Sequence, residues 1–598
     1  MRARLPLSSF DKQSNLLPAA AFALLLLATG CRGKQTTSNG KPVAAPNTAK
    51  YADTLTPLIA AKSLPFLRWP DIADFQPLVQ TFYNNRELQL AWSRDGKPTP
   101  QAAAMIAAFA AADKEGLNPE DYDTSRWQAR VQALASGDYQ AVAQFDIALT
   151  LDAMRLVSDL HMGRVAPQHF NFEIDTQSKK LDLPQFLNDR LLESSGIPDV
   201  LRSLEPDSDD FRKTKDALHH YQDLARQQTD PIALPDPGRN LGVGDSYIAR
   251  GPLEQRLALE GDGDFERALA DTPDAAAQKP GPLTVAESDA IKAYQSRHGI
   301  SPDGKLGSVT VRSLNVPLSK RVQQLSDALE RWRWLPDPYL HPRLMVNLPE
   351  FLLRGYTPEN QLDFTMRTVI GKAEGNHDTP VFTHMMKFLI FRPFWNVPVS
   401  IIKKELVPHI QANPHYLEEK NYEVVGHSGK PVTDYTATSI EHGGYLIREK
   451  PGPTNSLGLV KFMFPNQYDI YLHSTPAVGL FQRQRRDFSH GCVRVQHPDN
   501  LAVWVLDGQN GKDNEPWDLE HVQAAMNDGE DNKQVSLKTQ LPIVIFYLTA
   551  HVDQDGKVDF FDDLYNYDAD LDQTLEKGPP YPTKPNPVTP KTEPGDTV

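Results

Sequence analysis

Cys492 is the residue with the clearest chemical potential, because it lies in the segment Ser-His-Gly-Cys-Val-Arg-Val at 489–495 and is one of only two cysteines in the chain. The thiolate is the attacking form of cysteine, and a free thiol with a pKa of about 8.5 is mostly protonated at neutral pH. A catalytic cysteine therefore needs a base or a positive charge beside it. The alternative is a small apolar residue packed in a core.

Several nearby residues could act as the base or supply the positive charge that Cys492 needs. His473 ends a predicted strand 19 residues earlier and is our first candidate for the base, and His490 is a second candidate that we expect to face away from the sulfur. Gly491 allows a sharp turn whose N–H groups could hold an oxyanion. Arg494 falls on the same side as Cys492 of an extended chain, where it could favour thiolate or hold a substrate carboxylate.

The first 31 residues have the pattern of an export signal. Arg2 and Arg4 precede an apolar run from Ala19 to Gly30, which is shorter than the roughly 20 residues of a membrane-spanning helix. The segment from Ala28 to Cys31 resembles the lipobox of bacterial lipoproteins, although leucine is usual where Ala28 stands. Lipidation of Cys31 and ordinary cleavage nearby are both open, and either one predicts a protein of the periplasm or cell envelope. Contact with a membrane is expected only through a lipid on Cys31.

This location and the cysteine count bear on Cys492. Without Cys31 it has no partner for an intramolecular disulfide, and no further Cys or His at zinc-site spacing accompanies it. The formal net charge is −15, which argues against binding nucleic acid through a basic surface.

The elements that must position these residues follow a polar tether predicted over 32–50. Helical periodicity predicts a helical domain over 51–230, and a stretch rich in proline and glycine marks its end. From about 340 the pattern changes to strands, which predicts a β-rich domain over 340–565. The tail over 575–598 is dense in proline and is predicted to be disordered.

Residues 239–316 resemble the three-helix peptidoglycan-binding module of cell-wall enzymes. The resemblance is carried by segment 283–315, which has a predicted helix, a turn and a closing helix; the matching residues of the turn are Gly299, Ile300, Asp303, Gly304 and Gly307. It implies binding to peptidoglycan. The alternative is a helical linker in which Asp303 and Gly304 form only a turn.

The pattern of His473, Ser489, His490, Gly491, Cys492 and Arg494 resembles the signature of the L,D-transpeptidase family. Segments 391–401 and 455–476 match its large branch, so the resemblance covers about 60 to 565. It implies a multidomain α+β protein with a helical scaffold domain, the peptidoglycan-binding module and a β-sandwich-like catalytic domain, whose substrate-capping loop covers about 408–453.

The same resemblance implies a chemistry. Cys492, activated by His473, attacks a tetrapeptide stem of peptidoglycan, D-alanine leaves, and a neighbouring diaminopimelate amine resolves the thioester. Backbone N–H groups at His490, Gly491 and Cys492 hold the oxyanion, Ser489 belongs to the signature, and Arg494 orients the site. No metal or organic cofactor is implied.

Two other functions are open at this point. A carboxypeptidase or thiol hydrolase would use the same acyl-enzyme with water as the acceptor. A non-catalytic wall-binding lipoprotein would need only the peptidoglycan module, with no need for both His473 and Cys492. Other cell-wall enzymes are further expected partners.

Overall fold

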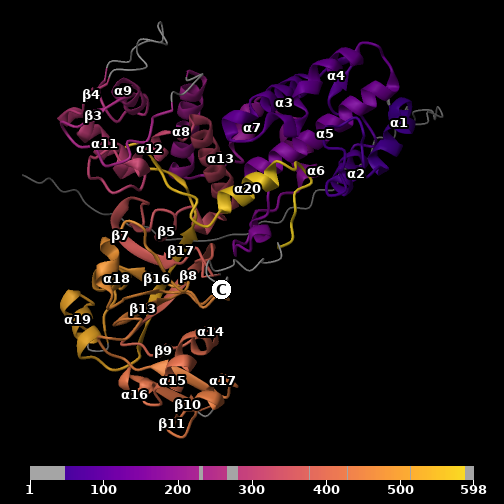
Figure 1. Ribbon diagram of the computed structural model, residues 1–598. Coiled ribbons are helices and arrows are strands. Elements are labelled where there is room, and N and C mark those ends of the chain that lie inside the picture. The colour runs from indigo at the N-terminus through magenta and orange to yellow at the C-terminus, as the bar shows by residue number, and fades with distance from the viewer. Residues whose placement is uncertain are drawn as a thin grey trace, which may run out of the picture. The chain divides into compact units, whose positions relative to one another are not determined.

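The computed structural model describes residues 48–227, 233–265, 280–375, 377–426, 429–511 and 514–585 (Figure 1). The predicted export signal, the lipidation site Cys31 and the tether as far as residue 47 lie outside these ranges. Residues 48–50, expected in the tether, instead begin helix α1 (Thr48–Ala60). Every helix in the described ranges is too short or too polar to span a membrane.

Helices dominate the chain as far as residue 227, as the periodicity predicts. Besides α1 they are α2 (Gln76–Asn85), α3 (Pro100–Ala110), α4 (Trp127–Leu134), α5 (Tyr139–Met162), α6 (Leu183–Phe186), α7 (Ile197–Arg202) and α8 (Asp209–Gln227). Short 3-10 or π turns join them: η1 (Ala112–Glu115), η2 (Pro119–Tyr122), η3 (Thr124–Arg126), η4 (Pro167–Phe170), η5 (Gln177–Lys179) and η6 (Leu187–Leu191). A small hairpin pairs β1 (Ser93–Arg94) with β2 (Lys97–Pro98).

Helix α5 is the central element of this helical region. Its residues are buried on nearly every side, which is the pattern of a helix enclosed by others. The Asp138 carboxylate accepts the N–H groups of Gln140 and Ala141 at its start, and Gly163 with a φ of +82° follows its end.

The helical region contributes to two hydrophobic cores. One core contains buried residues from Leu55 to Leu204, whereas Val165 to Ile174 and helix α8 pack in the core of the β-rich region. The long helix α13 (Leu318–Trp334) lies in that second core against α8. The helices expected over 51–230 thus divide their packing between two cores, because periodicity indicates that a helix face is buried without indicating its partner.

A small helical body with a core of its own follows, in the stretch where the peptidoglycan-binding module is expected. It contains α9 (Arg250–Leu259), α11 (Val285–Arg297) and α12 (Ser308–Leu314), and β3 (Ser246–Tyr247) pairs with β4 (Gly281–Pro282). The turn at Asp303 is tied to α11, because the Gln295 side-chain amide donates to the Asp303 carboxylate at 3.0 Å. Gly304, with a φ of +68°, completes this turn.

A nine-stranded sheet forms the β-rich region, as predicted. Its strands are β5 (Leu344–Asn347), β6 (Leu352–Tyr356), β7 (Leu362–Gly371), β8 (Phe382–Phe391), β13 (Val460–Met463), β14 (Leu472–His473), β15 (Asp487–Ser489), β16 (Val493–Val495) and β17 (Lys533–Phe546). Their order is β15-β7-β16-β14-β13-β8-β17-β5-β6, and β6 also pairs with β7. This extra pairing closes the sheet on itself.

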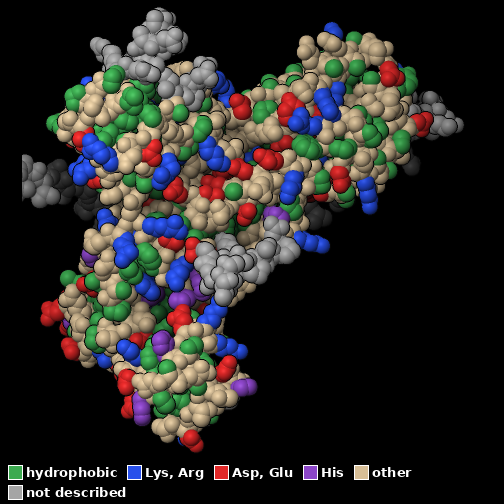
Figure 2. Space-filling view, in the orientation of Figure 1, with side chains coloured by type: hydrophobic (Ala, Val, Ile, Leu, Met, Phe, Trp, Pro, Cys, Tyr) green, Lys and Arg blue, Asp and Glu red, His purple; other side chains and the backbone are tan. Residues whose placement is uncertain are grey.

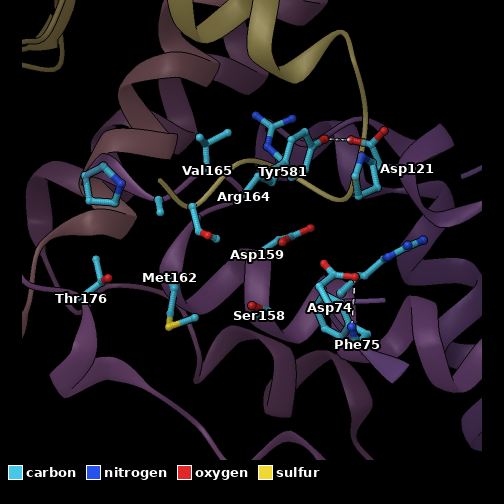
Figure 3. Close-up of a pocket in the computed structure, with 16 residues that line it drawn as sticks. Asp74, Phe75, Asp121, Ser158, Asp159, Met162, Arg164, Val165, Thr176 and Tyr581 are labelled. Carbon is cyan, nitrogen blue, oxygen red and sulfur yellow. Dashed lines mark hydrogen bonds between the residues drawn. The ribbon is translucent and has the colours of Figure 1, made fainter. Parts of the chain in front are cut away.

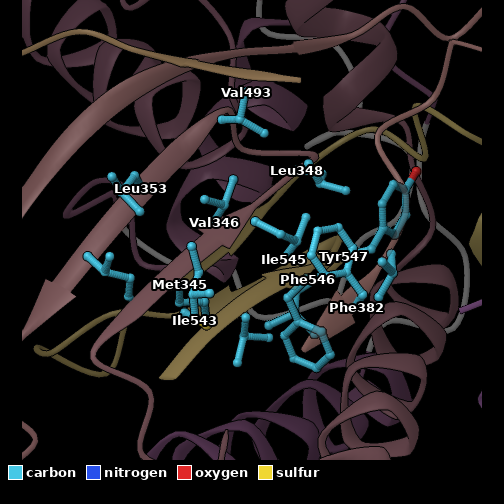
Figure 4. Packing of buried hydrophobic residues seen from close by; sticks show 14 of the residues in the cluster. Met345, Val346, Leu348, Leu353, Phe382, Val493, Ile543, Ile545, Phe546 and Tyr547 are labelled. Atoms are coloured by element: carbon cyan, nitrogen blue, oxygen red, sulfur yellow. The ribbon is translucent and has the colours of Figure 1, made fainter. Parts of the chain in front are cut away.

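The interior of the closed sheet is apolar. Val346, Ile543 and Ile545 pack together from β5 and β17 (Figure 4), whereas Phe546 lies on the opposite face of β17 and packs edge-to-face on Trp332 of α13. The remaining elements are η7 (Asp337–Tyr339), η9 (Val478–Gln482), α18 (Pro498–Val505), α19 (Leu519–Asn527), α20 (Tyr567–Leu575) and a hairpin of β18 (Ala550–Val552) and β19 (Val558–Phe560).

A separate folded unit, which we call the inserted subdomain (residues 395–449), lies in the chain between β8 and β13. It contains β9 (Trp395–Asn396), α14 (Val399–Ile401), η8 (Ile402–Leu406), α15 (Val407–Ala412), α16 (Tyr416–Glu419), β10 (Tyr422–Gly426), β11 (Pro431–Val432), α17 (Ala437–Glu441) and β12 (Tyr445–Glu449). Its sheet has the order β11-β10-β12-β9 and it has its own core. The loop expected over 408–453 is thus a subdomain that begins earlier.

The C-terminal tail is ordered as far as residue 585, so the prediction of disorder from 575 is wrong there; 586–598 lie outside the described residues. The Tyr581 hydroxyl donates to the Asp121 carboxylate at 3.0 Å, and the Lys584 carbonyl lies 2.9 Å from Nδ1 of His169. Tail residues Pro579, Tyr581 and Thr583 line a cavity of about 200 Å³ together with scaffold helix α5 (Figure 3). Proline density thus misled the prediction, because proline can also follow an extended path over a docking surface.

Candidate active site

Three adjacent strands place the candidate residues on one face of the sheet. Leu472, Val493 and Val495 are buried in the core, so alternate positions on β14 and β16 face the other way. In the strand register Lys461 of β13 lies beside His473 of β14, which lies beside Arg494 of β16. Cys492 directly precedes β16, two positions before Arg494. The structure therefore brings His473, Cys492 and Arg494 together.

Cys492 is a neutral thiol in this environment. Its Sγ donates to the Asp469 carbonyl over 3.7 Å, and burial raises the pKa of the thiol to about 11. Hydrogen bonds from the backbone and side chain of Tyr471 favour the thiolate, and so do the charges of Lys461 and Arg494. These contacts do not overcome the burial, so proton removal is left to a base.

His473 is held as a neutral imidazole. Its Nδ1 lies 2.6 Å from the Ser474 carbonyl, and because a carbonyl only accepts, Nδ1 carries the proton and Nε2 is left as an acceptor. Burial lowers the pKa of His473 to about 3, with a further lowering by the Arg494 charge. In the described residues no hydrogen bond joins this imidazole to the Cys492 sulfur, and the two are diagonal neighbours across the strand pair.

Ser489 and Gly491 shape the turn that presents Cys492. The Ser489 hydroxyl donates to the Cys492 carbonyl at 2.6 Å and accepts the Gly491 N–H at 3.1 Å. Gly491 has a φ of +122°, and a Cβ there would lie 3.1 Å from Cδ1 of Ile470. Because its N–H is already engaged by Ser489, Gly491 contributes its backbone conformation, in contrast to the oxyanion role expected for its amide.

His490 makes its contacts with the inserted subdomain and with His377. It stands two positions before Cys492, which in an extended chain is the same side, so alternation alone does not support the expectation that it faces away from the sulfur; the φ of +122° at Gly491 interrupts the extended chain between them. Its Nε2 pairs with the Glu405 carboxylate of η8 at 2.8 Å, and its ring packs edge-to-face on His377 with centroids 4.8 Å apart. His490 therefore links the catalytic turn to the inserted subdomain.

Two residues that hold the turn in place were missed by the sequence analysis. The Thr379 hydroxyl donates to the Gly491 carbonyl at 2.7 Å and accepts the Gly371 N–H at 2.9 Å. The Tyr565 hydroxyl donates to the Gly371 carbonyl at 2.7 Å. No local sequence signal could find them, because they lie far from Cys492 in the chain and meet it only in the fold.

Lys461 is a third missed residue. Burial lowers its pKa, and its Nζ lies 5.3 Å from the centre of the Tyr471 ring. The only available signal was the alternation of residues 460–464, in which this lysine occupies the polar side of a predicted strand.

Other histidines of the candidate region lie at the surface. His409, His415 and His442 are exposed on the inserted subdomain, where Figure 2 shows histidine side chains at the surface; His427 is outside the described residues. In the described ranges no group of three or more His, Cys, Asp or Glu side chains is arranged to hold a metal ion.

Comparisons with known proteins agree with this geometry. The family model described as a scaffold domain matches residues 77–218, and the model of the L,D-transpeptidase catalytic domain matches residues 341–514. A protein of Haemophilus influenzae named "Putative L,D-transpeptidase" is 30% identical over 270 residues, which are 44% of this chain and 52% of that protein. The chain thus spans about half the length of this curated relative.

The catalytic-domain match contains both His473 and Cys492, and the scaffold match falls on helices α2 to α8. The resemblance drawn from the sequence is confirmed by these matches. Residues 341–514 of this chain are therefore similar to the L,D-transpeptidase catalytic domain, and the preceding residues 77–218 are similar to the scaffold domain.

Proposed function

We propose that this protein is a cysteine L,D-transpeptidase that cross-links peptidoglycan stem peptides between diaminopimelate residues and releases D-alanine. The observation that carries the proposal is the pairing of a single described cysteine with a neutral, oriented histidine inside the matched catalytic domain. The relative's name describes the same class of enzyme.

In the first half of the proposed reaction Cys492 is acylated. Nε2 of His473 accepts the thiol proton while the sulfur bonds to the carbonyl carbon of the third stem residue. Because the Gly491 N–H is engaged, we assign the resulting oxyanion to the backbone N–H groups of His490 and Cys492. The tetrahedral intermediate collapses, His473 returns the proton to the departing amine, and D-alanine leaves.

In the second half the thioester is resolved. The side-chain amine of a second diaminopimelate attacks the thioester carbon, His473 takes a proton from this amine, and the sulfur leaves and is reprotonated. The link then joins the third residues of two stems. The inserted subdomain acts as the lid over this acceptor step, in keeping with its position in the chain and its contact with the catalytic turn through His490 and Glu405.

The other regions receive roles consistent with this reaction. The helical body at 239–316 binds peptidoglycan, and residues 1–31 export the chain to the periplasm or cell envelope, with Cys31 as the lipid attachment site. The scaffold domain spaces these parts and offers surface to other cell-wall enzymes.

The experiment is incubation of the purified protein with tetrapeptide muropeptides, followed by liquid chromatography and mass spectrometry. Dimers linked between diaminopimelate residues together with free D-alanine are expected, and Cys492→Ala should form neither. Tripeptide and D-alanine without dimer would replace the proposal by a carboxypeptidase, a reaction that the partial exposure of Cys492 to water favours. Absence of any cysteine-dependent product would favour a wall-binding protein.

A further inference from the structure

Two positively charged side chains flank Cys492 on the catalytic face. Lys461 and Arg494 lie on either side of His473 in the register of β13, β14 and β16, and both are half-buried. Both charges reach the sulfur, since each of them favours the thiolate of Cys492.

Neither cation has an anionic partner in the part of the chain that the structure describes. No ion pair or hydrogen bond is formed there by the Lys461 ammonium, whose Nζ faces the Tyr471 ring at 5.3 Å. Nε of Arg494 is buried without a hydrogen-bond partner among the described residues. A charge in such a place is costly unless an anion or ordered water meets it.

Other buried arginines of the described residues have acceptors. Arg331 donates to the Asp568 carboxylate at 2.5 Å, Arg354 lies 2.6 Å from the carboxylate of Glu350, and Arg333 donates to the Glu115 carbonyl at 2.6 Å. Among the described residues no carboxylate meets either of the two cations beside Cys492. We therefore expect a substrate to supply the anion that pairs with these two cations.

The sulfur itself is not that anion in the resting site. Burial still leaves the pKa of Cys492 at about 11, so the thiol is protonated despite the two charges. A peptide cut one residue from its end, by contrast, brings a permanent carboxylate close to the scissile bond.

We propose that Lys461 and Arg494 form a carboxylate-binding site beside Cys492, in which Lys461 is a specificity residue that binds the donor peptide's carboxylate next to the scissile bond. This inference rests on the proposed function for the identity of the donor. Two carboxylates could fill the site: that of the departing D-alanine, and that at the D-centre of diaminopimelate.

The first test uses two alkylating reagents that do not depend on transpeptidation. Iodoacetate carries a carboxylate and iodoacetamide is its neutral counterpart, so the ratio of their rates with Cys492 reports a nearby carboxylate site. We expect Lys461→Met to lower this ratio by about tenfold, in line with the strength of charged hydrogen bonds. Any loss of thiolate slows both reagents alike and leaves the ratio unchanged. Lys461→Arg should retain the ratio.

The matched control is Lys387→Met, which removes an exposed lysine from the neighbouring strand β8 and should leave both rates unchanged. An unchanged ratio in Lys461→Met would overturn the proposal. Equal slowing of both reagents would also overturn it, because that result assigns Lys461 to thiolate formation. Lys461→Gln replaces the methionine variant if the latter does not fold.

The second test identifies the carboxylate. Donor tetrapeptides are prepared with the D-alanine carboxylate amidated, or with the diaminopimelate carboxylate amidated, and kcat/KM is measured with wild type and Lys461→Met. The proposal expects one amide to lower kcat/KM about 10- to 100-fold in wild type but not further in the variant. Additive losses with both amides would contradict it. If no donor reacts at all, the proposed function fails while the alkylation ratio still decides the carboxylate site.

Discussion

The catalytic face of the large sheet and the inserted subdomain are built in opposite ways. His473 is only 3% exposed, and its strand is packed between β13 and β16 over a large core. The inserted subdomain has its own small core, and its described histidines are exposed. Side chains on the sheet are thus fixed by packing, whereas the subdomain can keep its fold while its position changes.

The ion pair of His490 and Glu405 links the inserted subdomain to the catalytic turn, and it is accessible to solvent. The side chains of His490 and Glu405 are 34% and 52% exposed, and such pairs contribute about 0–1 kcal/mol. We therefore expect the reaction rate to be sensitive to substitutions of buried residues in the sheet and tolerant of substitutions in the inserted subdomain. The following predictions test that contrast.

The largest effect is expected from the buried imidazole. His473→Gln removes the base and should lower the rate of Cys492 acylation about 10²- to 10⁴-fold. His442→Gln, which changes an exposed histidine of the inserted subdomain, should stay within about twofold of wild type, the scatter usual for surface changes. Acylation is followed by mass spectrometry of the acyl-enzyme. Similar losses of acylation rate in the two variants would contradict the proposed contrast between the sheet and the inserted subdomain.

The support of the catalytic turn should be nearly as sensitive. Thr379→Val leaves the Gly491 carbonyl and the Gly371 N–H without their partner, which should destabilise the protein by about 1–3 kcal/mol and lower kcat. Urea denaturation and acylation rates measure the two effects. Thr365→Val, at an exposed position of β7, is the matched control and should change neither. A stable variant with full kcat would show that the turn holds without Thr379.

Acid should destabilise the β-rich region through its buried histidines, such as His551 of the β18–β19 hairpin. Burial, assisted by Arg354, lowers the pKa of His551 to about 3, below the ordinary 6.5 of the unfolded chain. Between these values the unfolded state binds more protons, so stability is complete above pH 6.5 and falls as the pH approaches 3.

Protonation of one such histidine lowers the free energy of unfolding by about 2 kcal/mol by pH 5. Replacing the titrating group in His551→Gln should therefore reduce the difference in unfolding free energy between pH 7 and pH 5 by about that amount. The exposed His409 of the subdomain provides His409→Gln as a control with unchanged acid sensitivity. Equal curves for His551→Gln and wild type would contradict the prediction.

The smallest effect is expected at the link between the two regions. Glu405→Gln removes the charge that faces His490 and should change kcat/KM by at most about fivefold, with the difference shrinking at high salt. Thermal unfolding should be unaffected. A loss as large as that of His473→Gln would mean that the subdomain holds a catalytic group in place.

The chain sequence predicted the parts that depend on local pattern. Helical periodicity located the helical region, alternation located the strands, and the residues around Cys492 pointed to His473. Prediction failed where the structure of a segment depends on the distant part of the chain against which it packs. Residues 575–585 looked disordered, yet Tyr581 docks on Asp121. The predicted loop was a subdomain, since its glycines and prolines marked turns without revealing that the segments between them share a core.

The sequence by itself determined which groups could react: a lone thiol beyond the predicted export signal, a histidine at the end of a strand, and a glycine that permits a sharp turn. Only the tertiary structure decided which of these groups meet. Strand register placed Lys461, His473 and Arg494 in one row, and the φ of Gly491 turned His490 toward Glu405. The physical reason is that alternation along a strand assigns a side chain to a face, whereas its neighbours come from pairings between distant segments.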